Sequence, residues 1–253
     1  MTSVEYPEQG NEWCAAVEDN SWWFQHRSKF LLEVMRRFPP PTPLYDVGGG
    51  NGIVASALKT AGIRSIVVEP GQAGARRAKE RGLDALCTTL EGAGLPPASV
   101  PSIGMFDVLE HIEAPNAFLQ HARTLLKPGG RIYVAVPAYD ALWSAEDVYA
   151  HHFRRYTRRS LRAALQIAGF DVEFTTYMFA FLPLPILLMR SIPYRFGRAR
   201  PFTEEGARAD HTASNSPSRA LVQRLLGIEL RAFRRLGSLP FGASVVAVGK
   251  SKE

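Results

Sequence analysis

Glycines at alternate positions follow a short apolar strand near the start of the chain. The segment LYDVGGGNG, residues 44–52, contains an acid, Asp46, and then these glycines: Gly48, Gly50 and Gly52. A glycine loop between a strand and a helix lets a ligand approach the backbone closely, and the helix start presents unpaired N–H groups. Glu69 follows a second apolar run, 65–68, where an acid can accept hydrogen bonds from ribose hydroxyls. These residues predict a nucleoside-binding site, whereas the glycines alone are also compatible with a bare turn.

Four motifs in order give this site a more specific interpretation. The dinucleotide fingerprint GxGxxG would need glycine where the chain has Ile53, which argues against NAD. The pattern DxGxGxG, with a second strand that ends in an acid, resembles the first two motifs of class I S-adenosylmethionine-dependent methyltransferases. MFDVLEHI, residues 105–112, and LLKPGGR, residues 125–131, resemble the later motifs of the same family. The resemblance covers residues 40–170 and is closest to the small-molecule type, in a bacterial subgroup.

The resemblance implies that S-adenosylmethionine is the cofactor and assigns residues to its parts. The methionyl end would be held by Asp46 and by the loop glycines Gly48, Gly49, Gly50 and Gly52. Glu69 would bind the ribose hydroxyls and Pro70 would border the adenine. Thr89 or Leu90 stands where the family often has an acid for the adenine amino group, so the chain departs from the pattern there.

Asp107 lies at the expected tip of the fourth strand, beside the sulfonium site, and is both a cofactor-binding and a catalytic candidate. Asp107-x-x-Glu110 also has the spacing of a helix capping box, which is a structural alternative. His111 follows and is interpreted as a packed histidine more than as a base, because a base must reach the substrate proton.

A polar and aromatic segment follows the fifth strand, at residues 137–161. Its candidates for binding a polar or anionic acceptor are Trp143, Asp147, Arg154 and Arg155. If the acceptor is a hydroxyl or an ammonium, a base must remove its proton; His152 is the first candidate and His151 the second, with Tyr156 a further catalytic residue. The structural alternative is a loop pinned by salt bridges, with Thr157 or Ser160 as the cap of the next helix.

Composition is that of an ordinary globular protein, with 46% hydrophobic and 21% charged residues among 253. Cys14 and Cys87 are far apart and have no metal-ligand spacing, so we predict a reducing compartment and no metal site. The start of the chain has no apolar leader, which predicts a cytoplasmic location. The net charge of +6 comes mainly from arginines after residue 150 and indicates either solvated helix faces or a basic surface for nucleic acid, lipid or phosphorylated substrate.

The elements that must position these residues alternate along the chain. Apolar runs predict strands at 44–47, 65–68, 84–87, 102–106, 131–136, 171–177 and 243–248. Helices are predicted between the first five strands, at 53–60, 72–81 and 117–126, the last closed by the turn at 127–130. This alternation predicts a mainly parallel sheet with the site at its carboxyl edge. With the resemblance, the fold class is α/β: a Rossmann-like, doubly wound, seven-stranded sheet, mostly parallel with an antiparallel last strand.

Two segments depart from a minimal domain of residues 44–176 and 237–253. Residues 1–43 form an extension with a helix at 20–38, in which Trp22 and Trp23 either pack on the sheet domain or belong to a lid that lines the substrate entrance. Residues 177–236 form an apolar and basic helical insertion.

Within the insertion, the apolar run 177–189 is too short to span a membrane. This run could be a cap over the active site or an oligomer contact. The third alternative is an interfacial segment, in which residues 177–200 touch lipid. In that case four arginines would face the head groups: Arg190, Arg195, Arg198 and Arg200. A mobile loop is predicted at 203–218, followed by an amphipathic helix with an apolar stripe of Leu221, Leu225, Ile228 and Phe233.

The sequence therefore predicts a methyltransferase that acts on a small molecule or a lipid- or sugar-linked acceptor, with O- or N-methylation favoured and in-line displacement as the mechanism. It would be cytoplasmic, with the membrane contact through 177–200 left open. Two alternatives are an RNA-modifying methyltransferase, disfavoured because no appended RNA-binding module is recognised, and a nucleoside-binding module without turnover. The acceptor and the oligomeric state are not predicted.

Overall fold

A seven-stranded sheet runs through the computed structural model, which describes residues 18–199, 203 and 217–252. The strand order is β3-β2-β1-β4-β5-β7-β6. The strands are β1 (Leu44–Val47), β2 (Ser65–Val68), β3 (Asp84–Leu86), β4 (Val100–Phe106), β5 (Leu126–Pro137), β6 (Phe170–Met178) and β7 (Ser244–Ser251). The first five pair in parallel, whereas β7 is antiparallel to both of its neighbours, β5 and β6. The predicted α/β fold with an antiparallel last strand is confirmed.

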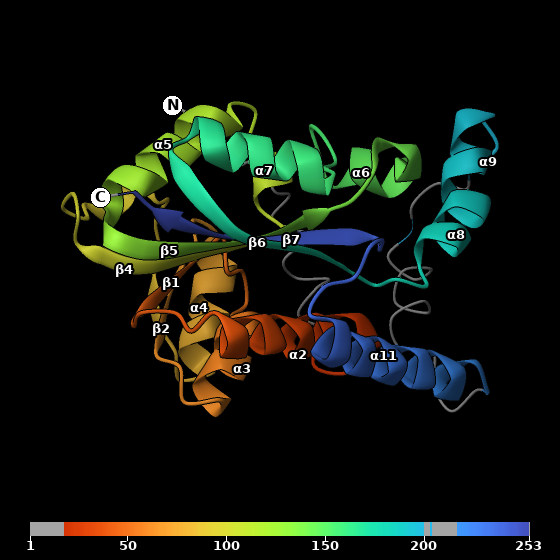
Figure 1. Cartoon of the computed structure of the whole chain (residues 1–253), viewed down its shortest axis with the longest axis horizontal. Helices are drawn as coiled ribbons and strands as arrows, with labels where there is room; N and C mark the ends of the chain where they lie inside the picture. The colour runs from red at the N-terminus through yellow and green to blue at the C-terminus, as the bar shows by residue number, and fades with distance from the viewer. Residues whose placement is uncertain (1–17, 200–202, 204–216, 253) are drawn as a thin grey trace.

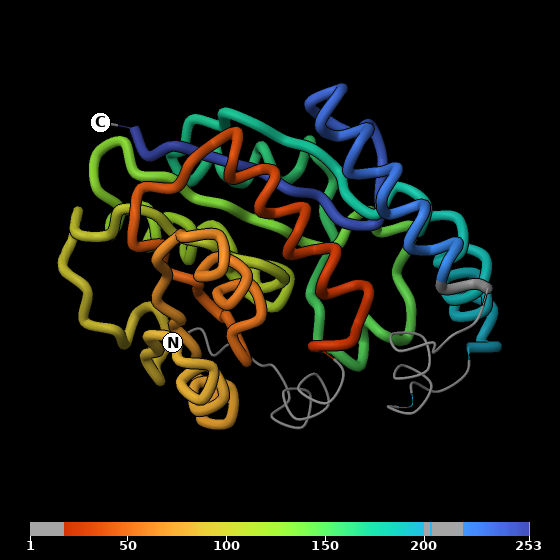
Figure 2. Tube along the Cα trace, turned by 90° about the horizontal axis from the view of Figure 1, so that it is seen from below, coloured from red at the N-terminus to blue at the C-terminus, as the bar shows by residue number. Residues whose placement is uncertain are grey.

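Helices cover both faces of the sheet (Figure 1). One face carries α2 (Trp22–Arg37), α3 (Ile53–Thr60), α4 (Gln72–Glu80) and α11 (Pro217–Leu236), and the other carries α5 (Pro115–Leu125), α6 (Ala145–Tyr149) and α7 (Arg158–Ile167). Figure 2 shows α2 and α11 side by side, although nearly 200 residues separate them in the chain. Each face has its own buried apolar cluster, so the sheet is the middle layer of a three-layer domain.

Several element boundaries differ from the predictions by a few residues, and two of the differences have identifiable reasons. Helix α2 begins after Ser21, whose hydroxyl accepts hydrogen bonds from the main-chain N–H groups of Trp23 and Phe24. Strand β5 begins at Leu126, directly after α5, so the predicted turn at 127–130 lies inside the strand. Val100 pairs with Leu126 and Ser102 with Arg131, and this shift in register shows that the turn residues form a bulge.

The insertion after β6 forms a second, smaller group of helices. A continuous helical segment contains α8 (Pro183–Ile186), a π-helical stretch (Leu187–Ser191) and α9 (Ile192–Arg195). The apolar run predicted at 177–189 is therefore divided, because its first two residues complete β6. Within the described ranges, no helix has the length and apolarity needed to cross a membrane. The predicted loop at 203–218 falls outside those ranges except for Thr203 and the first residues of α11.

The buried face of α11 differs from the predicted stripe. Leu226 and Phe233 are buried, whereas the side chains of Leu221 and Ile228 are 58% and 52% exposed. Leu226, Glu229 and Phe233 have the spacing of one helix face, and this face packs toward α2. The prediction that Leu221 and Ile228 share the apolar stripe with Phe233 is wrong, because a buried acid, Glu229, lies on the face that packs.

Two arginines of the insertion bind protein groups. Arg190 forms an ion pair with Glu146 of α6 at 3.3 Å, and Arg195 donates a hydrogen bond to the main-chain oxygen of Ala141 at 3.0 Å. These contacts join the segment 183–195 to residues 140–147. In the interfacial alternative these side chains would face lipid head groups, whereas here each binds a protein group. Arg200 lies outside the described residues.

Candidate active site

The loop after β1 can be formed only by glycine at its alternate positions. Gly48, Gly50 and Gly52 have φ values of +66°, +53° and +79°. A Cβ atom on Gly48 would lie 2.7 Å from Cγ2 of Val108, and one on Gly52 would lie 2.5 Å from Cδ1 of Leu83. The backbone conformation therefore disfavours a side chain at all three positions, and close packing also excludes one at Gly48 and Gly52.

Glu69 reaches from the end of β2 to this loop. Its carboxylate accepts hydrogen bonds from the main-chain N–H of Gly50 at 2.9 Å and from that of Gly71 at 2.8 Å. Burial raises the pKa of Glu69 above its ordinary value, and the two N–H groups oppose that rise. The predicted nucleoside-binding acid and the predicted loop are thus in direct contact.

Asp46 is buried beneath the loop. Its Oδ2 accepts no hydrogen bond from any other described residue. Burial raises the pKa of Asp46 to about 7; the negative charge of Glu69 adds to the rise, and the positive charge of Arg27 opposes it. An incompletely bonded, buried carboxyl group next to a glycine loop suits a ligand that brings hydrogen-bond donors or positive charge.

Arg27 of α2 extends to the tip of β4. Its guanidinium forms an ion pair with Asp107 and lies 4.8 Å from the ring centre of Trp23 and 5.1 Å from that of Phe24. Asp107 has a φ of +59°, and the short 3₁₀ helix that follows has Val108 at its N-cap position with no side-chain hydrogen bond. The predicted capping box is therefore wrong, because Asp107 binds Arg27 instead of the helix start.

The chain just before α2 also contacts the glycine loop. The carboxylate of Glu18 accepts hydrogen bonds from Nδ2 of Asn51, at 3.1 Å to each oxygen. Arg81, at the end of α4, lies 3.8 Å from Glu18 and 2.8 Å from Asp19. The extension thus contacts the loop through Glu18, and Arg27 reaches the tip of β4 beside it.

The predicted adenine side of the site is built from main chain and apolar groups. The hydroxyl of Thr89 accepts a hydrogen bond from the main-chain N–H of Gly92 at 3.1 Å, and Leu90 is buried in the core. The main-chain oxygen of Pro70 lies 3.8 Å from the thiol of Cys87. The acid that the family often places here has no counterpart in Thr89 or Leu90, whose side chains serve a turn and the core.

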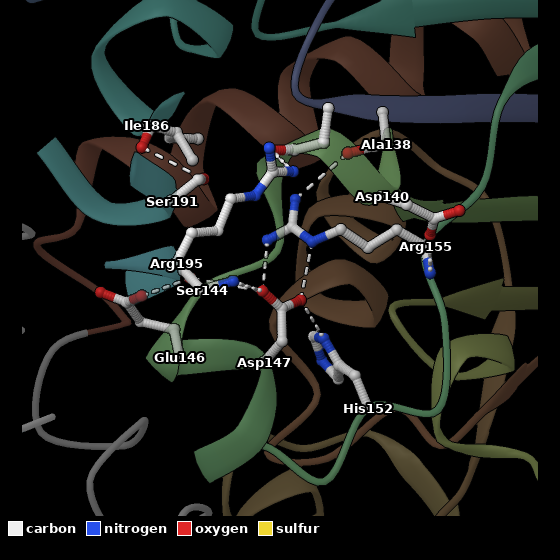
Figure 3. A network of polar contacts seen from close by, with 11 residues as sticks. Ala138, Asp140, Ser144, Glu146, Asp147, His152, Arg155, Ile186, Ser191 and Arg195 are labelled. Atoms are coloured by element: carbon white, nitrogen blue, oxygen red, sulfur yellow. Dashed lines mark hydrogen bonds and ion pairs between the residues drawn. The ribbon is translucent and has the colours of Figure 1, made fainter. Parts of the chain in front are cut away.

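Asp147 organises the segment after β5 (Figure 3). Its side chain is fully buried, and its two oxygens accept hydrogen bonds from Arg155 at 2.7 and 2.9 Å. Nδ1 of His152 lies 2.8 Å from Oδ1 of Asp147, and the main-chain N–H of Ser144 donates to Oδ2. Although burial opposes ionisation, the hydrogen bonds from His152 and Arg155 lower the pKa of Asp147 to about 2.

This geometry separates the predicted acceptor-binding residues into two groups. Asp147 and Arg155 are bonded to each other, and Arg155 also donates to the main-chain oxygen of Ala138, so both side chains are engaged with protein groups. Arg154 donates to the main-chain oxygen of Glu113 at 2.8 Å. Trp143 is half-buried and stays a candidate for contact with the acceptor.

Tyr156 is buried, and its hydroxyl lies 3.5 Å from the main-chain oxygen of Leu109. Burial raises the pKa of Tyr156 well above its ordinary value, which makes it a poor base at neutral pH. Its main chain bonds to Pro137 and Tyr139, so Tyr156 holds this segment against the end of β5. Thr157 and Ser160 form the predicted cap of α7.

A second polar cluster lies beside Asp147 and contains Glu110, His111 and His152. One ligand atom of each of these side chains lies within 4.8 Å of those of the other two, and the two imidazole rings meet edge to face with their centres 4.7 Å apart. Burial lowers the pKa of His111 to about 3, helped by the neighbouring imidazoles of His152 and His151. Burial raises the pKa of Glu110 well above its ordinary value. His151 itself is exposed, with a φ of +56°.

Trp22 and Trp23 connect the extension to the insertion. The ring of Trp23 stacks on that of Phe179 with centres 5.4 Å apart, and Trp22 meets the same ring edge to face at 6.4 Å. Nearby, Nε2 of His26 lies 3.0 Å from Glu229 of α11, whose carboxylate also accepts hydrogen bonds from the main-chain N–H groups of Phe179 and Ala180. The two tryptophans are thus partly buried and pack against the core where α2 meets the insertion.

Sequence reasoning did not assign Arg27, Glu110 or Glu229 to the site. Arg27 directly follows the aromatic cluster, and Glu110 lies between Asp107 and His111 in the motif at 105–112. Their positions in the chain did not indicate which groups would lie beside them in the fold. Their partners are distant in the chain, 80 residues away for Arg27 and 203 for the His26–Glu229 contact. Only the folded chain could bring these groups together.

Comparisons with known proteins agree with this geometry. Residues 22–174 match a protein family described as a methyltransferase domain. A bifunctional biotin biosynthesis protein of Cellvibrio japonicus is 30% identical over 148 residues, which are 55% of this chain and 30% of that protein. A ubiquinone biosynthesis O-methyltransferase of Parvibaculum lavamentivorans is 26% identical over 96 residues, which are 36% of this chain and 38% of the relative. Both matches span less than two thirds of the relative's own length.

A solved structure shares the fold across almost the whole chain. It is the methyltransferase in a complex with the activator protein Trm112 of Haloferax volcanii, with a TM-score of 0.61, 18% identity and coverage of 99% of this chain and 100% of that one. The family match extends from α2 into β6 and therefore includes the glycine loop, Glu69 and the His152 segment. The chain belongs to the methyltransferase domain family and is a class I S-adenosylmethionine-dependent methyltransferase.

Proposed function

We propose that this enzyme methylates a hydroxyl or amino group of a small-molecule or lipid- or sugar-linked acceptor, and that His152 activates that group. The position of His152 carries the proposal. It stands at the carboxyl edge of the sheet, beside the motif that ends β4, and a buried carboxylate holds its ring. An imidazole placed in this way suits proton removal from an acceptor near neutral pH.

The residues around the glycine loop fit the cofactor. The loop carries no side chain at its three glycines with positive φ, Glu69 lies at the loop, and Asp46 has an oxygen without a hydrogen-bond partner among the described residues. We assign the methionyl end to Asp46 and residues 48–52, with Asp107 next to it, the ribose to Glu69, and the adenine edge to Pro70, Thr89 and Leu90. Bound there, S-adenosylmethionine supplies a methyl group attached to a positively charged sulfur.

Arg27 adds a cation to this assignment. Its guanidinium lies among acids, paired with Asp107 and close enough to influence the pKa of Asp46. A cofactor that carries both a carboxylate and an ammonium group needs a cation as well as anions in its site. Arg27 is therefore assigned to the carboxylate of the methionyl end.

The Asp147–Arg155 pair is assigned the positioning of His152. Asp147 accepts from Nδ1 of His152, which leaves Nε2 to face the reacting group. The bonds from Arg155 hold the carboxylate in place and keep it ionised at neutral pH. Trp143, at the start of the same segment, is assigned to the acceptor's apolar part.

The insertion supports a lipid- or prenyl-linked acceptor within this class. Its exposed apolar side chains include Leu184, Leu188, Met189 and Phe196, with Met189 and Phe196 about three-quarters exposed at 76% and 74%. The segment is joined to residues 140–147, so a lipid surface bound there would deliver its molecules next to Trp143. The O-methyltransferase relative from ubiquinone biosynthesis makes a phenolic hydroxyl on a prenylated ring a suitable first probe.

The test uses the full chain, labelled S-adenosylmethionine, and catechol probes with and without a prenyl chain. We expect His152→Ala to lower methyl transfer by about 10²–10⁴-fold, because general base catalysis contributes about that factor, while cofactor binding measured by calorimetry stays within about 2-fold. His151→Ala is the matched comparison and should lower the rate far less, since His151 is exposed and outside the Asp147 contacts. Unchanged transfer by His152→Ala would contradict its assignment, and absence of transfer to every acceptor would favour a binding module.

A further inference from the structure

In the described part of the chain, the buried carboxyl group of Glu110 has no cation beside it that would stabilise its ionised form. Its side chain is 1% exposed, and neither of its oxygens accepts a hydrogen bond from another described residue. The two guanidinium groups that influence it are committed elsewhere: Arg27 is paired with Asp107, and Arg155 is paired with Asp147. A buried carboxylate with no close cation is costly, so its position calls for a ligand that supplies positive charge.

Two imidazoles complete a set of donors around this carboxylate. One atom each from Glu110, His111 and His152 lies within 4.8 Å of the other two. The residues come from the 3₁₀ turn after β4 and from the segment after α6, so the set exists only in the folded chain. Three donors from two histidines and one carboxylate are a familiar ligand set for a divalent transition metal ion, with positions left for water or substrate.

The outer contacts of the histidines have the form that metal-binding histidines require. Nδ1 of His152 is held by Asp147 at 2.8 Å, which leaves Nε2 as the donor. The His111 ring is held by the main chain of Ala150. Such carboxylate or carbonyl partners fix the ring orientation and the tautomer of a ligating histidine. His152 is 15% exposed, so an ion can reach the cluster from the His152 side.

We propose that Glu110, His111 and His152 bind one divalent transition metal ion of the Zn²⁺ type. The imidazole nitrogens favour such an ion over Mg²⁺ or Ca²⁺, which prefer oxygen ligands. This site departs from the prediction of no metal, which depended on the spacing of Cys14 and Cys87.

The role of the ion, though not its binding, rests on the proposed function. A hydroxyl bound at an open position of the ion loses its proton to water more readily, because the positive charge stabilises the oxyanion. His152 would then activate the acceptor as a metal ligand and not by taking up the proton itself. The site lies next to Asp107, which the cofactor assignment places beside the sulfur.

The binding test uses the full-length protein after treatment with a chelator. Zn²⁺ is titrated by calorimetry and Co²⁺ by its visible absorption, and we expect one equivalent of each to bind. Glu110→Gln and His152→Ala should each weaken Zn²⁺ binding by at least about 10-fold. Zn²⁺ should raise the melting temperature of the wild type but not of Glu110→Gln, since an ion stabilises only the state that binds it.

Matched control variants show whether a loss of Zn²⁺ binding is specific to the three residues of the cluster. Glu113→Gln makes the same change three residues away at an exposed position, and His121→Ala removes a histidine of α5 that is outside the cluster. Both should bind Zn²⁺ like the wild type. Circular dichroism shows whether each variant is folded, and Glu110→Gln, which preserves size, is the decisive one. Zn²⁺ binding that is absent, or equally strong in Glu110→Gln, would overturn the proposal.

Methyl transfer with and without the chelator distinguishes this proposal from the proposed function. Loss of transfer on chelation, with cofactor binding retained and activity restored by Zn²⁺, supports both. Transfer that still needs His152 but is unaffected by chelation, in a protein that binds no Zn²⁺, overturns the metal site and leaves His152 as a base. One equivalent of bound Zn²⁺ without transfer to any acceptor supports the site and counts against the proposed reaction.

Discussion

Asp46 illustrates how one buried residue prepares the cofactor site. It lies beneath the glycine loop, one of its oxygens lacks a partner among the described residues, and burial raises its pKa to about 7. A Cβ atom on Gly49 would lie 2.9 Å from that oxygen, so the loop leaves just enough room for it. The carboxyl group is therefore partly protonated near neutral pH, and a ligand that brings positive charge would favour its ionisation.

At this scale we expect Asp46 to make the enzyme less stable as the pH rises. The pKa of an unfolded Asp is about 3.9, whereas that of Asp46 in the folded protein is about 7. The folded state therefore binds the proton more strongly than the unfolded state. The protonated carboxyl group stabilises the fold at low pH, and this stabilisation is lost as the pH rises through about 7. Urea unfolding of the wild type and of Asp46→Asn from about pH 5 to about pH 8 should show the wild type losing up to about 1.4 kcal/mol per pH unit relative to the variant.

An exposed acid gives the control for this experiment. Asp84→Asn changes an exposed carboxylate at the start of β3, and its profile should stay parallel to that of the wild type. Parallel profiles for Asp46→Asn as well would show that Asp46 has an ordinary pKa in the folded state.

Predictability from the sequence also differed from residue to residue. Glu69 and the loop glycines follow directly from local spacing, because a strand, a turn and a helix are contiguous in the chain. The partners of Asp107 and Asp147 were harder. A local pattern indicated a capping box for Asp107, but the long-range ion pair with Arg27 prevailed. Asp147 was expected at the acceptor, and the structure shows its side chain bonded to Arg155 and His152.

At the scale of elements, Glu229 holds three of them together. Its buried carboxylate, on α11, receives His26 of α2 and the main-chain N–H groups of Phe179 and Ala180 after β6. Phe179 has a φ of +61°, so the chain turns sharply out of the sheet at this point. One acid thereby defines where the insertion leaves the core.

We expect Glu229→Ala to lower the free energy of unfolding by about 3 kcal/mol, because two buried N–H groups and an imidazole lose their acceptor. Glu229→Gln keeps one acceptor oxygen and should cost about 1 kcal/mol. Urea unfolding measures both. The comparison is Glu33→Ala on α2, whose partners Arg36 and Arg234 are exposed and whose loss should cost under about 1 kcal/mol. Equal losses for Glu229→Ala and Glu33→Ala would contradict the role given to Glu229.

Elements with a regular apolar pattern were predicted well. Features that depend on contact with another element, such as the packing face of α11 and the register of β5, were not. All seven strands and the helices between the first five strands appear close to their predicted positions, since alternation of buried strands and amphipathic helices is a local property. The stripe on α11 was misplaced because a buried acid belongs to its packing face. The turn at 127–130 became a bulge because its register depends on β4, a separate strand.

At the scale of the whole molecule, several exposed apolar side chains lie on α8 and on the π-helical stretch that follows it, at one end of the molecule (Figure 1); they are Leu184, Leu188 and Met189. We expect the enzyme to sediment with anionic lipid vesicles. The double variant Leu188→Ser/Met189→Ser should bind the vesicles about 10-fold more weakly for each residue changed, because each substitution removes an apolar side chain that would be buried in the lipid.

Ile167→Ser is the control for the vesicle experiment, because it removes a similarly exposed apolar side chain at the end of α7. It should leave vesicle binding unchanged. Sedimentation that is absent, or equally strong for the double variant, would assign the exposed residues to a role other than lipid contact.

Helix α2 carries two neighbouring residues with very different partners. Arg27 pairs with Asp107 at the cofactor side, and His26, the residue before it, pairs with Glu229 at the root of the insertion. A rigid helix cannot adjust one of these contacts without disturbing the other. We therefore expect a ligand bound beside Arg27 and a ligand bound at the root of the insertion to be coupled through α2, and each would then change the affinity for the other by the same factor.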